Sequence, residues 1–496
     1  MSVTSLIFGL FCLCAILVYR LAPVRFRNPW LLIVSLIFVI TWSWQLAAIL
    51  LGVAGVNYFL GGWLGQADKR RRYLLWIGII FNILVLIVMK YEYFYLPELT
   101  RWLEQMGIGL GPGALQVIVS VGLSFIALQM ISYLVDVSRG QLVPERRWLE
   151  FNLYVFYFPK FLSGPIERLK SFIPRLDEPR RLDRDRLIQA LGLIFIGLIR
   201  KRLFADMLNA MIPADAFTHP LNYTATILLS WLLAYAFALY NDFAGYSSIV
   251  RGLSSLFGIE LSNNFNLPYM ARSFSEFWNR WHISLSNWLR DYIFFPLSRL
   301  IQRKKPLHVE ALNLVIPPLV TMMVSGLWHG LSWSLLVWGG LHGTYLVLER
   351  LSKLRGPNIP VDELPKYRQV IGNVIVFLGV VLAWLPFRMD LVTAKGYLAG
   401  LILPARWAAP DWLFMRVVLS GHQKLGDVYA WNIPDPRIIL VLIAAILLDI
   451  AQMKKGEAML LRWPRWAQVT LFVVAALGFF LLAFSDTHAP FVYQGF

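Results

Sequence analysis

Seven histidines occur in this chain of 496 residues, and three of them lie in or beside apolar sequence. His329 follows an apolar run in MMVSGLWHGLSW, where Gly326 and Gly330 allow close backbone approach or a helix break. Burial in a low-dielectric environment favours neutral imidazole, which can remove a proton from a hydroxyl group. His329 is therefore a candidate general base for acyl transfer. The alternative is a buried structural histidine bonded to a backbone carbonyl.

His282 lies in the segment SFSEFWNRWHISLSNWLRDYIFFPL. Apolar residues recur there at spacings of three and four, opposite a polar stripe, which predicts one amphipathic helix at the membrane surface. The apolar stripe is Phe274, Phe277, Trp281, Leu285, Trp288 and Tyr292, and the polar stripe is Arg280, Ser284, Asn287 and Asp291. His282 falls at their border, where an ordinary interfacial histidine is the simpler interpretation. We expect His342, in GGLHGTYLVLE, to pack between helices.

Acidic residues are scarce in the apolar segments. Asp242, in ALYNDFAGYSS, ends one of these segments, where it could orient a histidine, bind substrate or cap the segment. The sequence has no Walker A loop, no G-x-S-x-G elbow and no spacing of His, Cys or acids that suits zinc. We therefore expect no metal site and no tightly bound cofactor.

The composition indicates what surrounds these residues. Hydrophobic residues make up 58% of the chain and charged residues 15%, whereas soluble domains carry about 25% charged residues. A conventional soluble enzyme is thereby excluded. The net charge of +17 is the surplus that cytoplasmic loops of membrane proteins show, so it predicts no nucleic-acid partner. Cys12 and Cys14 lie together in the first apolar segment and are interpreted as small apolar side chains.

The apolar segments predict about 11–13 transmembrane helices, since a span needs roughly 20 apolar residues. The candidates are 3–19, 30–47, 47–64, 73–89, 114–135, 187–203, 223–243, 310–326, 333–349, 369–387, 436–451 and 467–484. The first lacks signal-peptide features, so we expect it to be retained. Basic residues follow the first and third spans, which predicts that the N-terminus lies outside. Residues 1–496 are expected to form one integral domain.

Two segments do not fit a simple alternation of cytoplasmic and exterior loops. Residues 151–165 (FNLYVFYFPKFLSGP) are short for a crossing and have basic flanks, so they form either a re-entrant segment or an interfacial helix. The 187–203 segment ends in Arg200, Lys201 and Arg202 on the predicted outer side, which leaves open whether it spans or re-enters. The polar stretch 244–309 is expected to be cytoplasmic, and 401–435 exterior.

Several motifs together give the chain a likeness to a known family, with core motifs at about 122–350. GLSFIALQMISYLVDVSRG, FPKFLSGPIER, YNDFAGYSSIVRG, NFNLPYMARSFSEFWNRWHISLSNWLRDYIFFPL, SGLWHG and AWLPFRMD carry it. The chain resembles the membrane-bound O-acyltransferase (MBOAT) superfamily, and within it the bacterial alginate O-acetyltransferase branch. Asn241, where the family has an aromatic residue, and Pro386 are departures from the pattern.

This resemblance implies an all-α polytopic membrane protein of the MBOAT fold, in which tilted helices with re-entrant and interfacial segments surround a pore-like centre. It aligns His329 with the family's intramembrane histidine and His282 with a second histidine supplied from the cytoplasmic side. Both are therefore candidate catalytic residues. Five further residues of these motifs are candidates for substrate binding: Trp328 and Ser325 near His329, Asn279 and Arg280 near His282, and Asp242 in YNDFAGYSSIVRG.

The resemblance further implies a multi-pass protein of the bacterial cytoplasmic (inner) membrane. It would move acetyl from cytoplasmic acetyl-CoA to an exported acetyltransferase or another polysaccharide-synthesis partner, for O-acetylation of alginate, cellulose, peptidoglycan or a similar polymer. Lysophospholipid acylation and D-alanyl transfer from a carrier protein to teichoic acid remain as alternatives within the class. A transporter or flippase of a polysaccharide export complex, and a pure scaffold, are alternatives outside it.

Overall fold

The computed structural model describes residues 5–66, 69–106, 122–178, 181–304, 307–354, 363–403, 434–455, 464–470 and 473. Within these ranges every regular element is a helix. Six of the described helices are long and apolar enough to cross a membrane. They are α3 (Trp44–Gln66), α4 (Arg71–Lys90), α12 (Ala225–Leu256), α16 (Val309–His329), α18 (Lys366–Arg388) and α21 (Pro436–Lys455). The chain is therefore an all-α, multi-pass membrane protein.

Three further described helices are apolar but shorter: α1 (Leu6–Leu21), α6 (Leu123–Ser138) and α19 (Leu391–Ile402). The first two coincide with the predicted spans 3–19 and 114–135, whereas α19 lies in none of the predicted spans. Most of the predicted span 467–484 and almost all of the predicted exterior stretch 401–435 lie outside the described residues. The predicted total of 11–13 spans stays a prediction.

The described residues form two compact units. The first takes its residues from Met1–Ile194, Val250–Ser262 and Pro464–Pro490, and the second from Phe195–Ile249, Asn263–Trp463 and Phe491–Phe496. Besides α1, α3, α4 and α6, the first unit holds α2 (Val24–Ile40), α5 (Glu92–Gln105), α7 (Trp148–Phe156), α8 (Phe158–Phe161), α9 (Leu169–Asp177) and most of α10 (Arg184–Leu198). That residues 1–496 make one domain stays a prediction.

In the first unit, residues 151–165 fold as two short helices, α7 and α8, with a break at Tyr157. Every residue from 151 to 167 is buried. The Phe158 amide at the break donates to Ser35 Oγ at 3.1 Å, which satisfies one backbone group that the break frees. An interfacial helix would expose one face, whereas irregular backbone at membrane depth must be covered by protein. The structure thus favours the re-entrant alternative.

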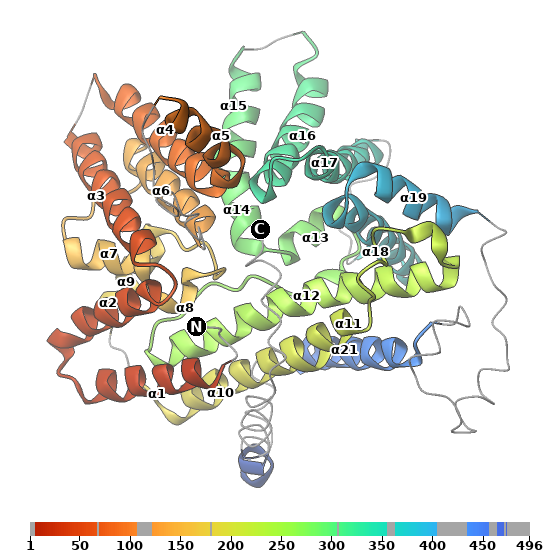
Figure 1. The fold of residues 1–496 in the computed structure, drawn as a ribbon, viewed down its shortest axis with the longest axis horizontal. Helices are drawn as coiled ribbons and strands as arrows, with labels where there is room; N and C mark the ends of the chain where they lie inside the picture. The colour runs from red at the N-terminus through yellow and green to blue at the C-terminus, as the bar shows by residue number, and fades with distance from the viewer. Residues whose placement is uncertain are drawn as a thin grey trace. The chain divides into compact units, whose positions relative to one another are not determined.

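The second unit contains the histidine segments, and Figure 1 labels its elements. Besides α16, α18, α19, α21 and most of α12, it holds η1 (Ile199–Asp206), α11 (Met207–Ala210), η2 (Pro220–Asn222), η3 (Pro268–Met270), α13 (Phe274–Arg280), α14 (Ile283–Leu289), η4 (Arg290–Phe294), α15 (Phe295–Lys304) and α17 (Trp333–Leu354). The helix predicted to end at residue 243 continues to Leu256. Asp242 does not end it, because a buried lysine neutralises its charge.

That lysine belongs to a π-helical segment, η1, in which consecutive cations point to different acids. The Arg200 guanidinium lies 2.5 Å from Asp449 of α21, and the Lys201 ammonium lies 2.6 Å from Asp242 of α12. Burial of a charge is tolerated when it is paired and hydrogen-bonded. These cations therefore form internal ion pairs, and they carry no information about which side of the membrane the segment ends on.

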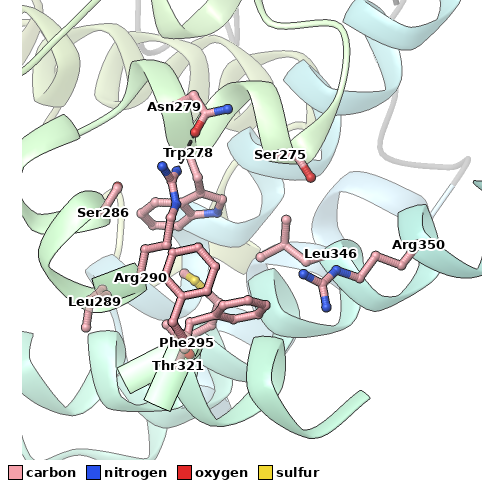
Figure 2. A pocket seen from close by; sticks show the side chains of 12 residues that line it. Ser275, Trp278, Asn279, Ser286, Leu289, Arg290, Phe295, Thr321, Leu346 and Arg350 are labelled. Atoms are coloured by element: carbon pink, nitrogen blue, oxygen red, sulfur yellow. Dashed lines mark hydrogen bonds between the residues drawn. The ribbon is translucent and has the colours of Figure 1, made fainter. Parts of the chain in front are cut away.

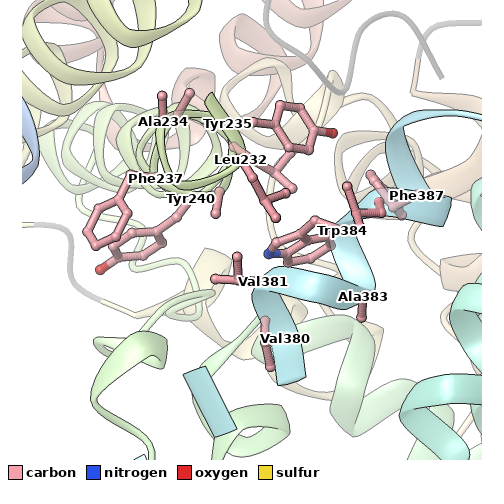
Figure 3. Packing of buried hydrophobic residues seen from close by; sticks show 14 of the residues in the cluster. Leu232, Ala234, Tyr235, Phe237, Tyr240, Val380, Val381, Ala383, Trp384 and Phe387 are labelled. Carbon is pink, nitrogen blue, oxygen red and sulfur yellow. The ribbon is translucent and has the colours of Figure 1, made fainter. Parts of the chain in front are cut away.

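Figure 3 shows how α12 and α18 pack in the core of the second unit. Leu232, Tyr235 and Phe237 of α12 belong to the same buried cluster as Val381 and Trp384 of α18. The Trp384 indole donates to the Tyr269 hydroxyl at 3.2 Å, and that hydroxyl donates to the Ala236 carbonyl at 2.7 Å. Buried aromatic residues satisfy their polar ends in this way. The packing fixes α18 beside the helices that carry the histidines.

Candidate active site

His329 is the last residue of α16, and two glycines determine its position. A Cβ atom at Gly326 would lie 2.1 Å from the Leu335 carbonyl oxygen, so α16 and α17 touch through their backbones there. Gly330 follows His329 outside the helix, with an extended backbone. Of the two predicted effects, the close backbone approach occurs at Gly326 and the end of the helix occurs at Gly330.

The His329 side chain is buried in an aromatic environment. Its ring centroid lies 4.9 Å from Trp328, 5.3 Å from Trp338 of α17 and 5.0 Å from Phe387 of α18. Ser325, one turn earlier on the same face, is fully buried, and its hydroxyl has no hydrogen-bond partner among the described residues. Three rings therefore restrict the space around the imidazole, while a hydroxyl donor is held beside it.

His282 breaks the segment that was predicted to be one amphipathic helix, and that prediction is wrong. Its backbone is left-handed, with φ 40°, and separates α13 from α14. Asn264 accepts two hydrogen bonds from the first residues of α14. Its backbone carbonyl oxygen accepts from the Ile283 amide, and its side-chain oxygen accepts from the Ser284 amide. Periodicity alone did not reveal the break, because the apolar stripe continues on both sides of it.

The break turns the His282 ring into the protein interior, where 1% of the residue is exposed. The ring packs edge to face against Phe243 of α12 at 4.8 Å, and it contacts Trp328 at 6.0 Å. Burial lowers the pKa of His282 to about 3. His282 is therefore a neutral imidazole at physiological pH. It shares the Trp328 indole as a neighbour with His329, so the structure brings both predicted histidines to one site.

His342 lies deeper in the same aromatic cluster. Its ring contacts Trp278 at 5.1 Å and Trp338 at 5.0 Å, and it is stacked on Phe277. Trp338 belongs to α17, as His342 does, so the contacts with Phe277 and Trp278 of α13 are those that confirm the predicted packing between helices. Neither ring nitrogen has a hydrogen-bond partner within the described part of the chain.

A cavity of about 370 Å³ opens beside this cluster, and Figure 2 shows its walls. The lining comprises Ser275, Trp278, Asn279, Ser286, Leu289, Arg290, Phe294, Phe295, Thr321, Met322, Leu346 and Arg350. Two of these are cationic and none is acidic. Arg350 lies over the Phe294 ring at 4.8 Å, and Arg290 donates to Asn279 Oδ1 at 2.5 Å. The cavity therefore offers two positioned guanidinium groups to an anionic ligand.

One face of α16 carries polar side chains from the cavity wall to His329. Thr321 lines the cavity, Ser325 follows at four residues and His329 at eight, so the three side chains lie on one helix face. All three residues are buried, and the hydroxyls of Thr321 and Ser325 have no hydrogen-bond partner among the described residues. We call Thr321, Ser325 and His329 the polar row. The spacing of these three residues can be recognised in the sequence, but the tertiary structure is needed to show that the Thr321 end of the polar row lies at the cavity.

The remaining predicted binding residues have different environments. Trp328 contacts both histidines, and Asn279 lines the cavity. Asp242 is engaged with Lys201, and Arg280 with Glu276 at 2.7 Å. Arg290 belongs to the basic stretch 272–305, whereas no sequence pattern singled out Arg350 or Thr321. Among the described residues, no group of three or more His, Cys, Asp or Glu could hold a metal ion.

The sequence profile of the membrane-bound O-acyltransferase family matches residues 146–387, which include both histidines and the whole cavity lining. A probable alginate O-acetylase of Azotobacter vinelandii is 32% identical over 442 residues, covering 87% of this chain and 81% of the relative. The chain belongs to the membrane-bound O-acyltransferase family. This MBOAT protein is an O-acyltransferase, as the site chemistry predicts.

Two other relatives show how far the similarity extends within the family. A peptidoglycan O-acetyltransferase of Helicobacter pylori is 30% identical and covers 76% of this chain and 74% of the relative. A teichoic acid D-alanyltransferase of Streptococcus thermophilus is 32% identical and covers 54% of this chain and 68% of the relative. Because the chain belongs to an acyltransferase family, the alternative interpretations as a transporter, a flippase or a scaffold are not needed. The catalytic roles of His329 and His282 stay predictions.

Proposed function

We propose that this MBOAT protein takes acetyl from cytoplasmic acetyl-CoA and passes it through the bacterial inner membrane to an exported acetyltransferase or another acceptor. The final product would be an O-acetylated extracytoplasmic polysaccharide, such as alginate, cellulose or peptidoglycan. The observation that carries the proposal is the cavity with Arg290 and Arg350, joined to His329 by the polar row.

The cavity chemistry suits a donor that carries phosphates. Guanidinium groups form charge-assisted, often bidentate hydrogen bonds with phosphate oxygens. The neighbouring Trp278, Phe294 and Phe295 provide flat apolar surfaces for an adenine ring or a pantetheine arm. The thioester would extend along the polar row, where the hydroxyls of Thr321 and Ser325 can donate to its polar atoms. The three rings around His329 would restrict the size of the acyl group that the site accepts.

The transfer step follows from a neutral imidazole at His329. The imidazole nitrogen removes the proton of the acceptor hydroxyl while the hydroxyl oxygen attacks the thioester carbonyl carbon and forms the C–O bond. The C–S bond then breaks, and the thiolate leaving group takes the proton from the imidazolium. The Ser325 hydroxyl and His282 are candidate donors to the developing oxyanion. An acetyl-histidine intermediate is the alternative route, in which the His329 nitrogen attacks first.

The relatives support the acetyl and polysaccharide parts of this proposal. One is named a probable alginate O-acetylase and another a peptidoglycan O-acetyltransferase, and each match covers more than 70% of this chain. The D-alanyltransferase relative supports a second candidate, D-alanyl transfer from a carrier protein, over a smaller part of the chain. The two candidates differ in donor, so the donor decides between them.

The test is consumption of radiolabelled acetyl-CoA by the purified full chain, with a serine-bearing peptide or exported partner as acceptor. His329→Gln should reduce transfer by about 10²–10⁴-fold, the usual contribution of a general base. His219→Gln is the matched control, because His219 is exposed and bonds to Thr218. Transfer from a D-alanyl carrier protein but not from acetyl-CoA would favour the second candidate. Equal turnover by wild type and His329→Gln would overturn the role of His329.

A further inference from the structure

A second cavity, of about 760 Å³, lies in the first unit, apart from the histidines. The last turn of α1 supplies Arg20 and the first turn of α2 supplies Val24 and Arg27 to its wall. The end of α9 with the residues that follow supplies Asp177, Glu178 and Arg181. Neither the family assignment nor the proposed transfer uses this cavity. Its walls combine cationic groups with apolar side chains.

Two of the guanidinium groups are held in place by one aromatic ring. Arg20 lies over Tyr19 at 5.4 Å and Arg27 at 5.3 Å, and Arg20 also donates to the Leu256 carbonyl. The Nε atom of Arg27 is buried and has no hydrogen-bond partner among the described residues. A desolvated guanidinium N–H of this kind is a strong donor to an anionic oxygen, and leaving it without one is unfavourable.

The charge of the cavity favours an anion. Three arginines face two carboxylates, and one of these carboxylates, Asp177, is already engaged by Arg147 at 2.7 Å. The guanidinium fork matches the oxygens of a phosphate ester in both geometry and charge. The cavity is therefore suited to a phosphate-bearing group.

Apolar surface beside the arginines indicates which kind of phosphate ester the cavity would bind. Val24 lines the cavity although 76% of it is exposed, and the neighbouring Leu21 is 85% exposed. Phe26 is also exposed. A soluble phosphate ester would make no use of these side chains, whereas the acyl chains of a lipid would cover them. The opposite wall begins at α9, whose Leu169, Phe172 and Ile173 are buried on one face, as in a helix that lies along a membrane surface.

We propose that this cavity binds the phosphate headgroup of an anionic phospholipid, with Arg27 and Arg181 on the phosphate and the acyl chains against Leu21 and Val24. Arg20, Arg25 and Arg27 form the basic turn that positive-inside bias assigns to the cytoplasmic side, so the lipid belongs to the cytoplasmic leaflet. Bound in this way, it links the end of α1 to the end of α9.

The test is thermal unfolding of the full chain in a neutral detergent, titrated with dioctanoyl-phosphatidylglycerol. The proposal expects a saturable rise in Tm. Arg27→Gln and Arg181→Gln should each raise the half-saturating concentration about tenfold or more, as expected when one charge-assisted hydrogen bond is lost. Arg25→Gln should leave it unchanged, because Arg25 lies on the same turn but is exposed over Phe26 and outside the cavity.

Three comparisons decide the outcome. Dioctanoyl-phosphatidylcholine should give a much smaller shift, and an equal shift would overturn the anionic headgroup. Glycerol 3-phosphate should give little shift, and stabilisation equal to that of the lipid would assign the cavity to a soluble phosphate ester instead. Equal weakening by Arg25→Gln would show that general surface charge, not this cavity, attracts the lipid. Arg181 is exposed, so its variant keeps the test informative even if Arg27→Gln unfolds.

Discussion

The Lys201 ammonium and the Asp242 carboxylate form an ion pair of 2.6 Å in which each side chain is only 1% exposed. Lys201 also lies 2.9 Å from Asp206. The residue after Asp242 is Phe243, whose ring packs against His282. The pair therefore holds the part of α12 that forms one wall of the His282 site, and we expect Asp242 to position that wall.

Asp242→Asn keeps the shape of the side chain but leaves Lys201 with only Asp206. Breaking a buried pair by removing one partner usually destabilises a protein by about 3–5 kcal/mol. Because Lys201 keeps its contact with Asp206, we expect the loss of stability to be near the lower end of this range. We expect a clearly reduced Tm in detergent, and recovery of most of it in the double variant Lys201→Met with Asp242→Leu. An unchanged Tm for Asp242→Asn would show that the pair contributes nothing to stability.

Gly326→Ala should separate α16 from α17. A Cβ there would lie 2.1 Å from the Leu335 carbonyl oxygen, which is backbone and cannot rotate away. The control is Gly340→Ala, since a Cβ at Gly340 meets nothing within 4 Å, and alanine is favoured over glycine in a helix by up to about 1 kcal/mol. Gly326→Ala should lower both Tm and transfer activity, whereas Gly340→Ala should lower neither. Similar behaviour of the two variants would contradict close backbone contact at Gly326.

Trp338→Phe should broaden the acyl group that the site accepts. Trp338 packs on His329 at 5.3 Å, so a smaller ring leaves space beside the imidazole. One methylene in an apolar site is worth roughly 10–200-fold in specificity. We expect the ratio of butyryl-CoA to acetyl-CoA turnover to rise about tenfold or more. Trp384→Phe is the control, because Trp384 contacts Trp338 at 6.1 Å one layer further away. An unchanged ratio in Trp338→Phe would show that this ring does not limit acyl size.

Arg350→Gln should weaken donor binding without slowing the chemical step. Arg350 lines the cavity, away from His329, so it contributes binding that is equal in ground and transition states. KM for acetyl-CoA should rise by about tenfold, the loss of one charge-assisted hydrogen bond, while kcat changes little. Arg303→Gln is the control, since Arg303 is exposed on α15 and outside the lining. A fall in kcat with unchanged KM would place Arg350 in catalysis instead.

His282 should make folding stability depend on pH. Burial lowers the pKa of His282 to about 3 from an ordinary value of 6.5, so the unfolded chain binds a proton below pH 6.5 that the folded chain does not. The contribution of the neutral, buried His282 to the free energy of unfolding is fully present above pH 6.5 and is lost as the pH falls from 6.5 towards 3. At pH 5 the loss is about 2 kcal/mol.

His282→Asn should remove this dependence, because asparagine tolerates the left-handed backbone but does not titrate. Denaturation at pH 7.5 and pH 5 should show a smaller difference in unfolding free energy for the variant than for wild type. The other histidines are common to both chains and cancel in the comparison. Parallel pH profiles would contradict a buried neutral His282.

A candidate chemistry for the site follows from the residues and their context. His329 was identified by a glycine-flanked imidazole at the end of an apolar run, and the spans by stretches of apolar residues too long for a soluble core. Such features are local, because membrane solvation acts on each segment separately. The motifs that resemble the MBOAT family gave the second histidine its candidate role, and the family assignment is confirmed.

What needed tertiary structure were the features that depend on residues far apart in the sequence. The break at His282 exists because Asn264 bonds to the start of α14, and helical periodicity is blind to that partner. Lys201 beside Asp242 and the cavity arginines Arg290 and Arg350 are brought together by helix packing alone. Hydropathy is a property of single segments, whereas pairing, capping and cavities are properties of neighbours. The sequence by itself therefore determined the membrane class and named His329 as a candidate base. The tertiary structure decided which side chains surround that histidine.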